Sequence, residues 1–302
     1  MSLPSVPLSS VSPRGQIVVF GAGYVGEAVC RHARERGLEV TALTRNPVKA
    51  AALSAFGVKT VIADLASEAW HSQVPEAPDY VVNCVSSGGG GISGYRLSYL
   101  EGARSLIVWA KAKSARGTLV YTGSTSVYPQ GAGTRVDEAS STTPPASENA
   151  GILLQTETLL QTWPGRTFVL RLSGIYGPGR HHLLDQMRAG SAELPGRGEH
   201  RLNLIYRDDI VDAIWRALTA PAAVGGQTLN LSDDGSAPRQ DVVGFLAKRL
   251  GVAVPRFTGE ASGGRRAVVP DRFIANARVK EVLGWEPRFP TFREGYAAIL
   301  GA

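Results

Sequence analysis

Short apolar runs alternate with amphipathic stretches along the first 170 residues of the chain. The runs are rich in valine, leucine and isoleucine, as is typical of strands buried in a parallel sheet. They lie at 17–20, 38–43, 58–62, 80–85, 118–121 and 167–171. Stretches with helical character lie between them at 24–36, 67–74, 95–113 and 149–161. This alternation predicts an α/β fold, a doubly wound parallel sheet with helices on both faces.

The regularity drops after about residue 175, where short apolar stretches are interrupted by glycine, proline and arginine. We therefore expect residues 15–175 to form the sheet domain and residues 176–302 a smaller C-terminal domain on the substrate side. A helical pattern at about 208–218 is expected to return to the sheet. Residues 1–14 are rich in serine and proline and lack a basic or apolar leader segment, so they predict a disordered tail.

The first apolar run leads into a glycine-rich turn with the spacing G-x-G-x-x-G. Gly21 permits a tight turn, Gly23 lets a pyrophosphate approach the backbone, and Gly26 lets the next helix pack closely. Tyr24 and Val25 open that helix, whose N-terminal N–H groups and positive dipole end favour phosphates. The motif follows a strand, opens a helix and leads into a second strand. It therefore predicts a Rossmann-type dinucleotide-binding domain.

Residues at the ends of the next strands indicate which dinucleotide is bound. An NAD site usually carries an acidic residue after the second strand, but this chain has Arg45, whose guanidinium suits a 2′-phosphate. Asp64 follows the third strand and either accepts a hydrogen bond from the adenine amino group or caps the helix expected at 67–74. Val85 and Ser86 end the fourth strand beside the ligand crevice. NADP is the expected cofactor, with NAD less favoured.

Composition narrows the classes of partner. The net charge of +6 suits an anionic small-molecule substrate, whereas the absence of any Lys/Arg run longer than two argues against a nucleic-acid partner. No apolar run reaches 18 residues, so no membrane association is expected. The two cysteines, Cys30 and Cys84, suggest a cytoplasmic protein without disulfides or a metal site. Nothing in the composition excludes a homodimer.

Five motifs in order along the chain resemble the extended short-chain dehydrogenase/reductase superfamily, which contains nucleotide-sugar epimerases and dehydratases. The closest similarity is to its atypical NAD-dependent epimerase/dehydratase-like subgroup, which includes the bacterial YeeZ-type proteins. The matching segments are 21–26, 124–128, 171–180, 203–209 and 283–285.

The resemblance implies a mechanism that this chain cannot follow unchanged. In the superfamily a Ser or Thr after the fifth strand orients the substrate, and Ser124 matches it. A Tyr-x-x-x-Lys pair on the next helix moves the proton, the lysine lowering the pKa of the tyrosine. Asn149 and Leu153 stand at these two positions, and neither can play those roles. Tyr176 matches a residue that packs beside the nicotinamide in relatives.

Another group must replace the missing proton donor if the protein is an enzyme. Tyr128 ranks first, Tyr206 second and His181 third, because all three lie in or beside motifs expected to line the crevice. Three functions stay open. They are an NADP-dependent oxidoreductase with a relocated donor, an epimerase/dehydratase-like enzyme acting on a nucleotide-sugar or other anionic substrate, and a non-catalytic NADP(H)-binding sensor.

Overall fold

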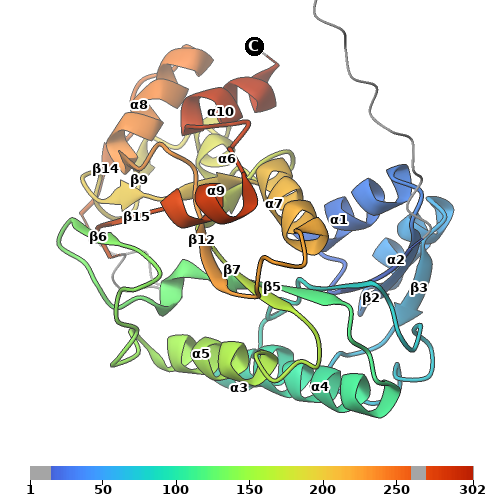
Figure 1. Ribbon diagram of the computed structural model, residues 1–302. Helices are drawn as coiled ribbons and strands as arrows, with labels where there is room; N and C mark the ends of the chain where they lie inside the picture. Colours follow the sequence, from blue (N-terminus) through green and yellow to red (C-terminus); the bar gives the residue numbers. More distant parts are fainter. Residues whose placement is uncertain (1–14, 260–269, 302) are drawn as a thin grey trace, which may run out of the picture.

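The computed structural model describes residues 15–259 and 270–301 (Figure 1). The tail predicted at 1–14 lies outside the described residues. The centre of the molecule is a seven-stranded parallel sheet in the order β12-β7-β5-β4-β1-β2-β3. Its six predicted strands are β1 (Gln16–Phe20), β2 (Glu39–Thr44), β3 (Lys59–Ile62), β4 (Tyr80–Asn83), β5 (Thr118–Ser124) and β7 (Thr167–Leu172). The doubly wound Rossmann-type sheet is thus confirmed, and its winding reverses between β1 and β4.

The seventh strand, β12 (Thr228–Leu231), pairs in parallel with β7 at one edge of the sheet. The sequence pattern did not predict it, and it lies in the range expected to form the smaller domain. Its four residues read Thr-Leu-Asn-Leu, with a buried asparagine in place of a continuous apolar run. The sequence of β12 alone carries no clear strand signal, and the segment is extended because it pairs with β7.

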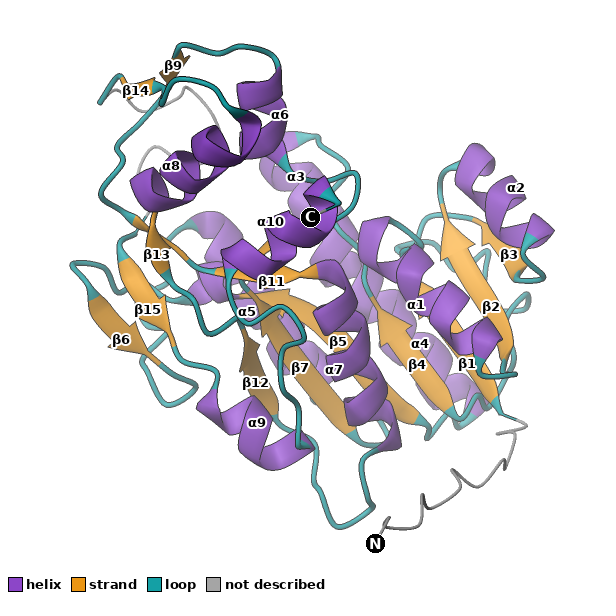
Figure 2. Ribbon diagram, turned by 90° about the horizontal axis from the view of Figure 1, so that it is seen from above, coloured by secondary structure: helices purple, strands orange, loops and turns teal. Residues whose placement is uncertain are grey.

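Helices cover both faces of the sheet (Figure 2). On one face, α1 (Tyr24–Glu35), α7 (Arg207–Thr219) and α9 (Ala277–Leu283) share a core with Val19, Val82 and Val120. On the other face, α4 (Gly102–Lys113), through Trp109, and α5 (Glu148–Leu160) pack with Phe20 and the indole of Trp70. The helix expected at 208–218 is therefore part of the layer that covers the sheet.

Helix α2 (Pro47–Ala55) follows β2 and was not expected from the sequence pattern. The side chain of Asn46 caps it by accepting hydrogen bonds from the N–H groups of Val48 and Lys49, at 2.9 and 3.1 Å. Pro47 occupies the first helical turn, where its missing N–H costs nothing. The Asn-Pro pair was the signal for this helix, and it places the first turn beside the end of β2.

The helix expected at 67–74 was a wrong prediction, because this segment forms successive turns. The N–H of Ser67 bonds to the carbonyl of Asp64, and the Ser67 hydroxyl donates to the same carbonyl. The indole of Trp70 donates to the carbonyl of Leu65. Side chains that bond to the local backbone compete in this way with helix formation.

The long helix expected at 95–113 begins earlier, at Gly91. It consists of α3 (Gly91–Arg96), one π-helical segment, η1 (Leu97–Glu101), and α4. Such π-helical insertions are frequent at functional sites because they change the direction of a few side chains. Here the segment contains Ser98, which lines a groove described below.

A smaller unit stands above the carboxyl edge of the sheet. Its core unites α6 (His182–Arg188), α8 (Arg239–Leu250) and α10 (Phe292–Leu300). Four short strand pairs connect this part of the chain: β8 (Gly174–Tyr176) with β11 (Leu204–Tyr206), β10 (Arg201–Leu202) with β13 (Ala237–Pro238), β9 (Glu193–Leu194) with β14 (Arg256–Phe257), and β6 (Thr134–Val136) with β15 (Arg272–Ile274).

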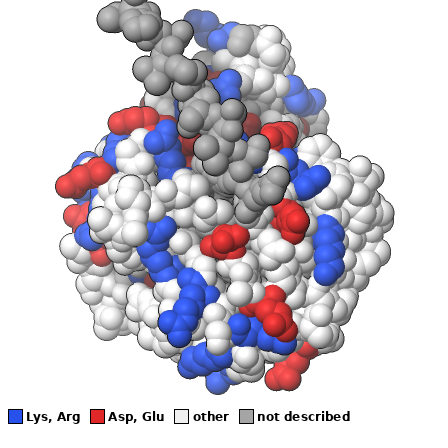
Figure 3. Space-filling view, turned by 45° about the vertical axis from the view of Figure 1, so that its right-hand side comes forward, with Lys and Arg blue, Asp and Glu red and all other residues white. Residues whose placement is uncertain are grey.

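The charged surface and the helices bear on the expected classes of partner. The face drawn in Figure 3 carries both basic and acidic side chains, and neither sign covers it entirely. Within the described part of the chain, no helix combines the length and apolarity needed to cross a bilayer.

Candidate functional site

A groove of about 530 Å³ lies at the carboxyl ends of β1, β2 and β4, where the winding of the sheet reverses. Ligands of open α/β sheets bind at this kind of edge. Six of the residues expected to bind the cofactor line the groove: Gly21, Gly23, Arg45, Asp64, Val85 and Ser86. The structure therefore brings together, at one sheet edge, residues from four separate turns.

The three glycines of the first turn meet different constraints. Gly21 has a φ of 82°, and a Cβ there would lie 2.6 Å from the backbone of Val85. A Cβ on Gly26 would lie 2.3 Å from the carbonyl oxygen of Gly21, so this glycine allows the helix to pack on the turn. Around Gly23 the nearest protein atom to such a Cβ is 3.9 Å away. The protein's own packing does not require glycine there, as expected of a position that the cofactor's pyrophosphate approaches closely.

The helix that follows has no side-chain cap at its start, because Gly23 is its N-cap residue. Its first N–H groups and its positive dipole end are therefore presented to the groove. Val25 is buried in the core beneath. Tyr24 points away from the groove: its hydroxyl donates to the carbonyl of Pro178 at 3.0 Å, and burial raises its pKa to about 12. Tyr24 thus supports the turn from behind.

Charged side chains gather at the end of the groove formed by β2 and β3. Nη1 of Arg45 lies 3.2 Å from Oδ2 of Asp64. Lys49, in the first turn of α2, lines the same end. The sequence interpretation missed Lys49 because it missed α2, although Asn46 and Pro47 signal that helix. This end of the groove therefore carries two cationic side chains, which suit an anionic group.

The opposite wall of the groove follows β4. The N–H of Val85 donates to the side-chain oxygen of Asn83 at 3.1 Å, which fixes the turn after the strand. Gly88 and Ser98 continue this wall and were not predicted. The four-glycine loop that contains Gly88 was a visible signal for a ligand border, whereas Ser98 reaches the groove only through the π-helical segment.

Ser124 ends β5 and caps the short 3-10 helix η2 (Thr125–Val127). Its hydroxyl donates to the hydroxyl of Ser126 at 2.9 Å and accepts a hydrogen bond from the Ser126 N–H. Ser124 therefore lies after the fifth strand of the chain, where the sequence motif placed it, at the carboxyl end of β5. Ser126 is a second hydroxyl there that sequence reasoning did not single out.

Tyr128 is completely buried and belongs to an internal network. Its hydroxyl donates to Oδ1 of Asn230 at 2.8 Å and accepts from Nη1 of Arg171 at 2.9 Å. Arg171 in turn forms a buried ion pair with Glu157, with Nη2 and Oε2 2.6 Å apart. Burial raises the pKa of Tyr128 despite the neighbouring guanidinium. This arrangement gives no support to its first rank as proton donor.

Tyr176 and Tyr206 also point into the protein. Their rings meet edge to face at 5.3 Å, and Tyr206 stacks on Phe289 at 4.0 Å. The hydroxyl of Tyr176 donates to the carbonyl of Thr291 and lies where a Cβ on Gly295 would be. Burial raises the pKa of both tyrosines. Neither lines the groove, although both were expected to face the crevice.

The two positions of the missing catalytic pair differ in burial. Leu153 is 1% exposed and packs with Val127, Tyr128 and Ile274, so this position has become core. Asn149 lies in the first turn of α5 and is half-buried. Its Oδ1 is shielded from solvent and accepts no hydrogen bond from the described residues.

His181 precedes α6 and is mostly enclosed. Its Nδ1 lies 2.8 Å from Oδ1 of Asp185, one helical turn further along. The carboxylate therefore lies within ion-pair distance of the imidazole. Among the three donor candidates, His181 is the one that pairs with an acid.

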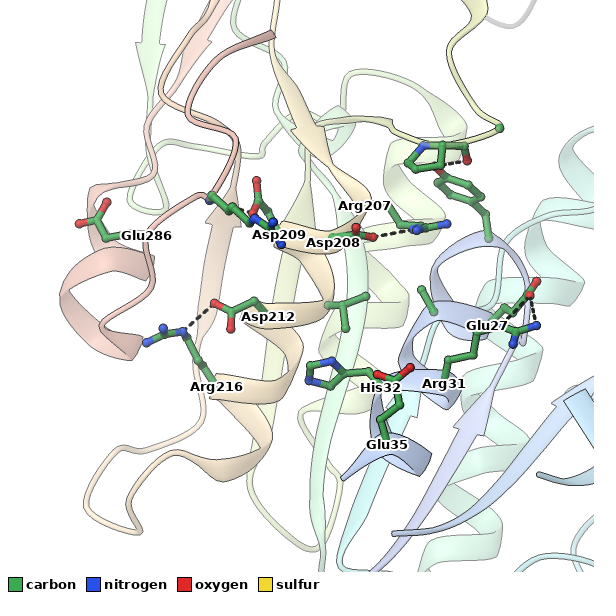
Figure 4. Close-up of a pocket in the computed structure, with 16 residues that line it drawn as sticks. Glu27, Arg31, His32, Glu35, Arg207, Asp208, Asp209, Asp212, Arg216 and Glu286 are labelled. Carbon is green, nitrogen blue, oxygen red and sulfur yellow. Dashed lines mark hydrogen bonds and ion pairs between the residues drawn. The ribbon is translucent and has the colours of Figure 1, made fainter. Parts of the chain in front are cut away.

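A second cavity, of about 860 Å³, lies between α1 and α7 (Figure 4). Its walls are charged, and each of the two helices contains an ion pair of its own. Arg31 bonds to Glu27 on α1 at 3.1 Å, and Arg216 bonds to Asp212 on α7 at 2.7 Å. Arg31 and Arg216 are therefore already paired within their own helices.

Comparisons with known proteins agree with this geometry. Protein YeeZ of Escherichia coli K12 is 27% identical over 285 residues, which are 91% of this chain and 96% of its own. The 3-diazoavenalumate denitrifying reductase of a Streptomyces species is 26% identical over 313 residues, with 93% and 98% covered. A solved structure from Methylobacillus flagellatus, described as an NAD-dependent epimerase/dehydratase, superposes with a TM-score of 0.72 at 28% identity, covering 95% and 98% of the two chains.

A family model matches residues 17–232, which include the glycine turn, the groove, Ser124 and the sheet through β12. The match, the fold and the groove all concern the same residues. The chain belongs to the NAD dependent epimerase/dehydratase family.

Proposed function

We propose that the protein is an NADP(H)-dependent oxidoreductase that acts on a small anionic substrate. The observation that carries this proposal is the cation pair, Arg45 and Lys49, where an NAD site would place a carboxylate. The cofactor, when bound, supplies or accepts a hydride at the nicotinamide. The glycine turn would hold its pyrophosphate, and Arg45 with Lys49 its 2′-phosphate.

The substrate would be oriented at the carboxyl end of β5. Ser124 and Ser126 form a hydroxyl pair there, and one hydroxyl can donate to a substrate oxygen while the other fixes its direction. For proton transfer we favour His181 over Tyr128 and Tyr206, because the two phenols are buried among protein groups. The relative that is named a reductase supports reduction over epimerisation.

Calorimetric titration with NADP⁺ and NAD⁺ tests the cofactor assignment. We expect tighter binding of NADP⁺, and a loss of about 1–3 kcal/mol for NADP⁺ alone in Arg45→Ala, the scale of a hydrogen bond to a charged group. Arg278→Ala is the control, because this exposed arginine lies on α9 beside β12, at the opposite edge of the sheet. Equal affinity of the wild-type protein for both cofactors would refute the proposal.

A sensor of the NADP(H) redox state is the second candidate, and the burial of Leu153 favours it. A lysine at that position would hold the nicotinamide ribose in an active relative, whereas here the position is filled by packed core. If a broad carbonyl panel gives no turnover while NADP⁺ and NADPH change the affinity for a partner differently, the sensor function replaces the enzymatic one.

A further inference from the structure

Arg45 and Asp64 form an ion pair inside the cofactor groove. They follow the neighbouring parallel strands β2 and β3, whose carboxyl ends meet at this edge. Nη1 of Arg45 and Oδ2 of Asp64 are 3.2 Å apart, and both residues line the groove. The side chains are 49% and 34% exposed, so the pair is reachable by a ligand.

Asp64 is restrained by more hydrogen bonds within its own turn than Arg45 is. Asp64 is fixed by its turn: its Oδ1 accepts the N–H of Ala66 at 2.9 Å, and its carbonyl accepts two hydrogen bonds from Ser67. The Arg45 side chain instead extends across the groove, with Nη2 lying 2.5 Å from where a Cβ on Gly88 would be. The long side chain of Arg45 thus contacts a carboxylate, that of Asp64, which local hydrogen bonds hold in place.

A 2′-phosphate needs the same guanidinium. Arginine binds phosphate and carboxylate with the same planar set of N–H donors, so the two anions compete for it. An exposed ion pair is weak, which means that a phosphate can displace it at a small cost. Lys49 is the second groove cation, and among the described residues it forms no ion pair. The competition therefore concerns Arg45 alone.

We propose that Asp64 is an internal competitor of the 2′-phosphate for Arg45, and that it limits how strongly the protein discriminates NADP from NAD. The inference rests on the proposed function, since it takes the adenosine end of the groove as the cofactor site. In this role Asp64 weakens the binding of the 2′-phosphorylated cofactor, so removal of its charge should strengthen that binding.

The test uses calorimetry with adenosine 2′,5′-bisphosphate and 5′-AMP, which differ only in the 2′-phosphate. In Asp64→Asn we expect affinity for the bisphosphate to rise about three- to fivefold, the scale of the weak ion pair that no longer competes for Arg45. The affinity for 5′-AMP stays within about twofold, because the asparagine oxygen can still accept from adenine. Glu68→Gln is the matched control, since it removes one exposed carboxylate from the same segment.

A double-mutant cycle with Arg45→Ala separates competition from direct repulsion. Without Arg45, Asp64→Asn should change the bisphosphate affinity by no more than about twofold. A full effect that persists in this background overturns the proposal, as does an equal weakening of both ligands. Asp64→Ser, whose hydroxyl can still accept from Ala66, repeats the test if the asparagine variant unfolds. Failure of the proposed function would appear separately, as equal affinity of the wild-type protein for the two ligands.

Discussion

The cofactor groove and the cavity between α1 and α7 meet at the start of the same helix, yet they are built differently. Gly23 borders the groove and Tyr24 the cavity. The cavity is the larger, at about 860 Å³ against 530 Å³. In the cavity, Arg31 and Arg216 bond to acids one turn away, whereas the groove presents an uncapped helix start and Lys49, which forms no ion pair among the described residues. In this protein, hydrogen-bond donors without a protein partner indicate the binding site better than the volume of the cavity does.

The largest effect is expected from a substitution that fills the open space beside Gly23 in the glycine turn. In Gly23→Val the branched side chain would occupy the open path of the pyrophosphate, and we expect NADP⁺ affinity to fall by about 100-fold or more. Calorimetry measures the affinity, and circular dichroism checks that the fold is kept. Ala28→Val, which adds a similar volume at the cavity, is the control and should bind normally. Native affinity in a folded Gly23→Val protein would place the cofactor elsewhere.

Substitutions in the cavity wall are expected to change the free energy of unfolding and to leave cofactor affinity unchanged. Asp209 is buried there and accepts the N–H groups of Arg288 and Phe289. Burial raises its pKa to about 6, so the native protein holds this proton more tightly than the unfolded chain does. The free energy of unfolding therefore falls as the pH rises from about 4 to 6, by about 2 kcal/mol from this group.

Asp209→Asn removes this titration. Urea unfolding of both proteins at several pH values between 4.5 and 7.5 should show that their difference in stability changes over the lower half of the range. Cofactor affinity of the two proteins at pH 7.5 should agree within about twofold, because Asp209 lies in the wall of the cavity and does not line the groove. A difference independent of pH would mean that Asp209 is ionised throughout.

The smallest expected effect comes from the ion pairs that line the cavity. Arg31→Ala breaks the exposed pair with Glu27, which is worth about 0.3–0.5 kcal/mol of stability. Denaturant titration measures that loss, and cofactor binding should not change. If Arg31→Ala weakens cofactor binding as much as Arg45→Ala does, the cavity takes part in binding and the comparison fails.

The groove could be predicted from sequence because its determinants are local. Gly21, Gly23 and Gly26 act within one turn, and Arg45 and Asp64 each directly follow a strand. Parallel strands bring such positions to one edge whatever the rest of the chain does. Helix α2 was missed although its signal, Asn46 followed by Pro47, was also local.

The tyrosines could not be placed in this way, since long-range packing decides where their hydroxyls point. Tyr176 turns toward α10 because Gly295, far along the chain, leaves room for its hydroxyl. Tyr128 turns toward Asn230 on β12, a strand that the sequence pattern did not reveal. Motif membership located these residues on the correct elements, but the direction of each side chain depends on partners more than 100 residues away.

Strand β12 has a consequence for how the chain acquires its fold during synthesis. It closes the sheet by pairing with β7, but residues 173–227 must be translated between the two. Until then, β7 is the outermost strand and exposes a row of unpaired backbone groups, which can pair with another chain. A nascent chain shorter than 228 residues therefore carries an open sheet edge, and this is the stage at which chaperone protection matters most.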